Sequence, residues 1–93
     1  MTEQDIVKKL ESEGYDKVYV YEAKPCEVDD EHEHDFDTKL FIISGNIRIK
    51  VLSGGAIQDF SLKKGSELEI LRKQIHSAIV GTEGCRYVVA ERK

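Results

Sequence analysis

The sequence predicts an all-β fold: a small barrel preceded by a short N-terminal helix. Between residues 17 and 92, apolar and polar side chains alternate with a period of two in several short segments, as in strands that bury one face. Glycine-containing turns separate these segments at a spacing of roughly ten residues, which is typical of barrels and sandwiches. A chain of 93 residues has the length of one domain. We therefore expect a single domain over residues 1–93, with a helix at about 2–13 and a barrel at about 17–92.

The helix is predicted from its end signals. Thr2 is a suitable N-cap, and Asp5 stands three residues later as a weak form of the capping box. Gly14 occupies the position where a glycine commonly follows the last helical turn. The apolar residues between positions 6 and 10 form only a narrow stripe. Such a helix is expected to lie across the outside of a larger element.

About eight strands are expected from the alternation. They cover residues 17–24, 28–34, 40–43, 47–51, 56–62, 66–71, 75–80 and 85–91. Ser44, Gly45 and Asn46 separate two of these segments and are typical of a tight hairpin turn. Residues 81–84, which contain two glycines, are expected to separate the last two strands.

The composition argues against several functional classes. A net charge of -4 does not suit a nucleic-acid surface, which needs a basic stripe to neutralise phosphates. No apolar run reaches the roughly 18 residues of a membrane-spanning helix, and the N-terminal segment has no apolar signal core. We therefore expect a cytoplasmic protein without a nucleic-acid or membrane partner. Cys26 and Cys85 fit that compartment as free thiols.

One acidic segment, DDEHEHDFD at residues 29–37, carries possible chemistry. Side chains two apart on a strand point to the same face, so His32 and His34 project together from Cα atoms about 7 Å apart. The acidic residues between them then point to the opposite face. Two imidazoles inside a barrel can meet one metal ion at about 2.0–2.1 Å. His76 lies on a distant strand and would extend such a site across the barrel.

These motifs resemble those of the cupin family. The family's first motif contains a histidine-x-histidine pair, then a glutamate, and, after six further residues, a glycine; His32, His34 and Gly45 match its histidines and its glycine. The second motif runs from a glycine turn to a lone histidine, and Gly65 and His76 match it. The resemblance is greatest to small single-domain cupins and covers nearly the whole chain outside the helix. It implies a double-stranded β-helix, or jelly-roll barrel, and a homodimer.

The resemblance also implies a three-histidine site for a divalent transition metal. Iron, manganese, nickel, copper and zinc all suit such donors. Thr38 occupies the position of the family's glutamate ligand. Asp37, next to it, is a candidate replacement ligand, and the alternative is an aspartate in a solvated turn. For the histidines themselves, the alternative is a metal-free barrel in which they only form hydrogen bonds.

Two functions follow from this site. The first is a small metalloenzyme that binds a small molecule directly at the metal, with dioxygenase-like oxidation as the reaction to test first. The second is a non-catalytic module that binds or senses a metal or small ligand. Arg72 and Lys73, which precede His76, either attract a carboxylate-bearing ligand to the metal or form a solvated turn.

Overall fold

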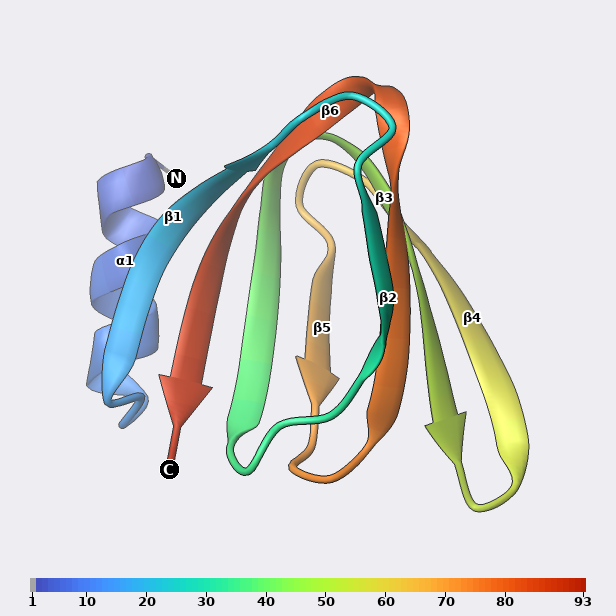
Figure 1. The fold of residues 1–93 in the computed structure, drawn as a ribbon. Helices are drawn as coiled ribbons and strands as arrows, with labels where there is room; N and C mark the ends of the chain where they lie inside the picture. The colour runs from blue at the N-terminus through green and yellow to red at the C-terminus, as the bar shows by residue number, and fades with distance from the viewer. Residues whose placement is uncertain (1) are drawn as a thin grey trace.

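The computed structural model describes residues 2–93, which form one helix and six strands (Figure 1). In chain order these are α1 (Glu3–Ser12), β1 (Lys17–Ala23), β2 (Val28–His32), β3 (Asp37–Ser53), β4 (Ala56–Leu62), β5 (Glu67–Ile70) and β6 (Ile75–Arg92). All strand pairs are antiparallel. The central order is β1-β6-β3-β4, with β2 also paired to β6 and β5 also paired to β3.

The two longest strands, β3 and β6, pair along nearly their whole length and bend over together at one end of the molecule (Figure 1). Their register runs from Asp37 opposite Arg92 to Leu52 opposite Ile75. On one side of the bend, β1 and β5 extend the sheet; on the other side, β2 and β4 extend it. The sheet thereby folds over itself, which confirms the expected all-β barrel with an N-terminal helix.

The prediction of turns at residues 44–46 and 81–84 is wrong. Both segments lie inside continuous strands, β3 and β6. Gly45 and Gly84 have φ angles of +78° and +79°, which glycine adopts without the steric cost of a side chain. A Cβ atom on Gly45 would lie 2.0 Å from the carbonyl oxygen of Gly84. These glycines therefore let two strands bend in contact rather than end, and the eight expected strands become six.

The barrel interior is lined by apolar side chains from both halves of the folded sheet. Buried members of this core include Leu40, Ile42, Ile47, Ile49, Val51, Leu62, Ile70, Val80, Tyr87 and Val89. Burial of this apolar area supplies the main favourable free energy of folding. The remaining turns agree with the sequence: residues 54–55 connect β3 to β4, and a turn at residues 63–66 precedes β5.

The helix α1 covers the outer face of the sheet, as its narrow apolar stripe predicted. Ile6 and Leu10 are buried against Val88 and Ala90 of β6. The capping box is present, since Thr2 Oγ1 accepts a hydrogen bond from the Asp5 amide at 3.1 Å and the Asp5 carboxylate accepts one from the Thr2 amide at 3.0 Å. With ten residues, α1 is too short to cross a bilayer, and residues 2–93 contain no other helix.

Candidate metal centre

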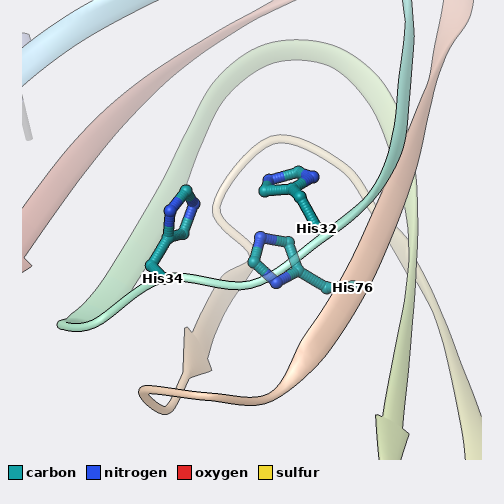
Figure 2. Close-up of side chains that lie close together, drawn as sticks. All are labelled: His32, His34 and His76. Atoms are coloured by element: carbon teal, nitrogen blue, oxygen red, sulfur yellow. The ribbon is translucent and has the colours of Figure 1, made fainter.

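Three imidazoles from two segments of the chain, residues 32–34 and the start of β6, point toward one another (Figure 2). The nitrogen atoms that His32, His34 and His76 offer as ligands all lie within 4.8 Å of one another. The ring centroids are 4.1 Å apart for His32 and His76, 4.9 Å for His32 and His34, and 5.1 Å for His34 and His76. The convergence expected from the sequence is therefore present.

Strand pairing explains this arrangement. His32 ends β2 and lies directly opposite His76 on β6. His34 follows β2 by two residues, and its carbonyl oxygen accepts a hydrogen bond from the Lys73 amide at 2.8 Å. That bond fixes the segment after β2 to the turn that leads into β6. The acidic residues at 31, 33 and 35 are exposed, whereas His32 and His34 are half-buried, as the alternation predicted.

Two of the rings are oriented by backbone carbonyls. His76 Nδ1 lies 3.1 Å from the Gln74 carbonyl oxygen, and His32 Nδ1 lies 2.6 Å from that of Asp30. A carbonyl oxygen can only accept a hydrogen bond, so Nδ1 carries the proton in both rings. In the neutral ring, the lone pair is then on Nε2. A metal-binding histidine is commonly held in this way by a hydrogen bond from its other nitrogen.

Burial keeps two of the rings in the neutral form. Desolvation lowers the pKa of His34 below 6.5, and the neighbouring His32 lowers it further. Desolvation also lowers the pKa of His76, against the opposing effect of its hydrogen bond to the Gln74 carbonyl. Neutral imidazole is the form that binds metal ions. These two imidazoles are therefore neutral near pH 7.

The histidines lie in the wall of a cavity of about 330 Å³. Its apolar wall is formed by Leu40, Ile47, Ile49, Ile70, Ala78 and Val89, and its other polar side chains are Tyr19, Tyr21, Asp29, Thr38, Tyr87 and Glu91. Thr38 is only 7% exposed, and its Oγ1 has no hydrogen-bond partner within residues 2–93. A buried hydroxyl without a partner is rare in folded proteins. In the resemblance to cupins, Thr38 occupies the position of the glutamate ligand.

Asp37 makes contacts outside the histidine group. Its Oδ1 accepts hydrogen bonds from the Arg72 amide at 3.0 Å and from Arg72 Nε at 3.3 Å, and its Oδ2 lies 3.7 Å from an Arg92 nitrogen. The hydrogen bonds from Arg72 lower the pKa of Asp37. The group of converging side chains that could hold a metal ion contains the three histidines and does not include Asp37.

The two basic residues before His76, Arg72 and Lys73, pair with acidic side chains outside the histidine group. Arg72 pairs with Asp37, and Lys73 forms an ion pair with Asp35. Neither residue lines the cavity. The sequence did not single out Asp29, Glu91 or the Thr38 hydroxyl as parts of one cavity, because only long-range pairing brings them together.

No family model and no curated protein matches this sequence. Among solved structures, oxalate decarboxylase from Bacillus subtilis is similar with a TM-score of 0.76 and 17% identity, over 82% of this chain and 20% of that one. A formate complex of Lactobacillus farciminis oxalate decarboxylase gives a TM-score of 0.76 and 21% identity, over 82% and 23%. A domain of Drosophila melanogaster CENP-C gives 0.74 and 16%, over 82% and 58%. This chain thus spans about a fifth of the decarboxylases and under two thirds of the CENP-C chain.

Proposed function

We propose that His32, His34 and His76 of this chain, which has the cupin fold, bind one divalent transition metal. A small molecule in the adjoining cavity would bind to this metal. The observation that carries this proposal is the placement of three ligand nitrogens within 4.8 Å of one another beside a cavity of about 330 Å³. Such a cavity lies at the lower end of the size range of small-molecule sites.

The chemistry of the donors fits a metal. His34 and His76 are neutral because burial lowers their pKa, and the hydrogen bonds of His32 and His76 to backbone carbonyls leave Nε2 available. Three neutral ligands leave the ion its full charge and open coordination positions. Iron, manganese, nickel, copper and zinc accept this donor set. The similar Bacillus subtilis oxalate decarboxylase has Mn(II) centres.

We infer that the site is that of a small metalloenzyme, with oxidation of a small molecule by dioxygen as the first reaction to test. A bound metal would supply Lewis-acid polarisation or oxygen activation. The residues of this chain would hold the metal, exclude bulk water with the apolar cavity wall, and orient the ligand through the polar side chains. A non-catalytic binding module is the second candidate. It is favoured by the similar domain of CENP-C, which has been solved bound to CAL1.

Metal content tests the site directly. Protein purified without chelators or a nickel column is expected to retain about one transition metal per chain, measured by elemental analysis. His76→Gln is expected to lose it. Asp37→Asn is the matched comparison: retained metal indicates a three-histidine site, and lost metal makes Asp37 a fourth ligand. Absence of stoichiometric metal after reconstitution of the wild-type protein would contradict the proposal, as would equal binding by His76→Gln.

Turnover separates the two candidate functions. The metal-loaded protein is placed in an oxygen electrode with a panel of small acids, thiols and amines, and His76→Gln serves as the inactive control. Oxygen uptake that depends on His76 supports the enzyme. Saturable binding of a panel member without uptake supports the binding module.

We also propose that the chain forms a homodimer through the outer face of β3, β4 and β6. Leu52 is paired with Ile57 on one side and with Ile75 on the other, so the three side chains share one face. Ile57 is 70% exposed, and Ile79, further along the same face, is 54% exposed. Contiguous exposed apolar side chains commonly mark an interface. Sedimentation is expected to show a dimer at micromolar concentration and a monomer for Ile57→Lys; a monomeric wild-type protein would contradict this proposal.

The cytoplasm is the proposed compartment, because Cys26 and Cys85 are both free thiols and reducing compartments keep thiols unpaired.

A further inference from the structure

The charges of the cavity differ from those that a carboxylate ligand requires. Its charged lining residues are Asp29 and Glu91, and no lysine or arginine within residues 2–93 lines it. A site for a dicarboxylate normally contains arginine or lysine, which pair with the carboxylates. A bound metal would attract one anionic group of such a ligand, but the rest of the ligand would still face two carboxylates.

Two basic residues close to the cavity in the sheet, Arg92 and Lys17, do not line it. Arg92 lies 4.8 Å from the centroid of the Tyr15 ring and close to Asp37 and Glu69. Lys17 places its Nζ 5.2 Å from the centroid of the Tyr19 ring, and Lys17 is the register partner of Glu91. Asp29, in contrast, forms no ion pair with any residue of the described chain.

Two aromatic rings line the same cavity as Asp29. Tyr21 and Tyr87 line the same cavity, with ring centroids 5.6 Å apart and planes tilted by 50°. Burial raises the pKa of Tyr87, and the charge of Asp29 adds to that rise. The Tyr21 hydroxyl donates a hydrogen bond to the Glu27 carboxylate at 2.7 Å, so a further negative group lies next to Tyr21. Aromatic faces and carboxylates together favour a cation.

A second feature of the cavity is an unpaired polar group in its wall. Thr38 is more than nine-tenths buried, lines the cavity, and has a hydroxyl without a partner among the described residues. An unpaired buried hydroxyl costs free energy and is rare in folded proteins. The acidic and aromatic side chains therefore belong to a cavity that already contains an unpaired polar group.

We infer that the cavity selects a small molecule with a cationic amine, which binds beside Asp29 and the rings of Tyr21 and Tyr87. This inference deepens the proposed function, because it names the charge class of the ligand at the same site. It distinguishes this cavity from one for a dianion such as oxalate. Asp29 acts here as a specificity residue and requires no metal for its effect.

Three probes with one apolar tail test the charge preference: butylammonium, 1-butanol and butyrate. They are titrated into metal-free protein at neutral pH, and binding is followed by the amide NMR shifts of cavity residues such as Ala78 and Val89. Butylammonium is expected to bind at least about tenfold more tightly than butyrate, with 1-butanol between them, because Asp29 attracts one head group and repels the other. Equal or tighter binding of butyrate would overturn the inference, as would the absence of cavity shifts with butylammonium.

The Asp29→Asn variant identifies the responsible side chain. It is expected to weaken butylammonium binding about fivefold and to bring the three probes closer together in affinity. Asp30→Asn is the matched control, because Asp30 is an exposed neighbour that does not line the cavity; its affinities are expected to stay within about twofold of wild type. An unchanged probe preference in Asp29→Asn would overturn the assignment.

His76→Gln separates this inference from the metal proposal. The variant removes a metal ligand and leaves Asp29, Tyr21 and Tyr87 in place. Metal-free His76→Gln is expected to keep the preference for butylammonium over butyrate. In the wild-type protein, absence of metal binding with this preference intact would contradict the proposed metal function alone, and absence of the preference with metal binding intact would contradict the ligand class alone.

Discussion

Substitution of Gly45 tests how the sheet folds over itself. The residue has a φ of +78°, and a Cβ there would lie 2.0 Å from the Gly84 carbonyl oxygen and 2.9 Å from the Cys85 Cα. Non-bonded heavy atoms are most stable at about 3.5–4.0 Å, so the backbone of β3 or β6 must move by more than an ångström. We expect Gly45→Ala to cost about 1–2 kcal/mol for the left-handed conformation and about 1–3 kcal/mol or more for the overpacking.

Gly65→Ala is the matched control for this measurement. Gly65 has a similar φ of +86°, but nothing lies within 4 Å of its added Cβ. It should therefore lose only the conformational contribution of about 1–2 kcal/mol. Urea unfolding followed by circular dichroism gives both values, and each kcal/mol corresponds to about 4–8 °C in Tm for a domain of this size. Equal losses in the two variants would refute the close crossing of β3 and β6 at Gly45.

Three smaller predictions concern the site and the helix. The folded pKa values of His34 and His76 lie below their unfolded value of 6.5, so the unfolded chain binds more protons in the window below pH 6.5. The metal-free protein should therefore lose stability as the pH falls through that window. Replacing both rings with glutamine should flatten this pH dependence of the free energy of unfolding, measured by urea unfolding. Thr38→Val removes an unpartnered buried hydroxyl and should raise the free energy of unfolding by about 1 kcal/mol; a lower urea midpoint would show that the hydroxyl has a partner in solution. Thr2→Ala removes the N-cap of α1 and should lower the stability by about 1 kcal/mol, whereas an unchanged Tm would contradict the capping box.

The sequence predicts what local geometry determines. Period-two alternation correctly places His32 and His34 on one face, and it orients most strands, because neighbouring side chains alone set that pattern. The turn expected at Gly45 fails for a physical reason. A positive φ serves a hairpin and a strand bend equally well, and only the carbonyl of Gly84, 39 positions along the chain, distinguishes them.

The cavity could not be predicted for the same reason. In the sequence, Asp29 belongs to a run of acidic residues typical of a charged, solubilising strand. Thr38 occupies the position where the glutamate ligand of cupins is missing. Their shared environment arises when β2 and the first part of β3 both come to face the cavity. No local pattern contains that information, because the residues that line it belong to strands paired with different halves of β6.

The bend links the candidate metal centre to the proposed ligand site. His32, His76 and Asp29 belong to the part of the sheet where β2 pairs with the first half of β6, whereas Tyr21 and Tyr87 belong to the part where β1 pairs with its second half. A molecule that reaches from a metal on the histidines to these rings would contact both parts. Its binding would therefore oppose opening of the bend, since a ligand stabilises the conformation that it binds. In the metal-loaded protein, an amine ligand should slow amide hydrogen exchange in β6 on both sides of residues 81–84; slowing confined to the β2 side would place the ligand at the histidines alone.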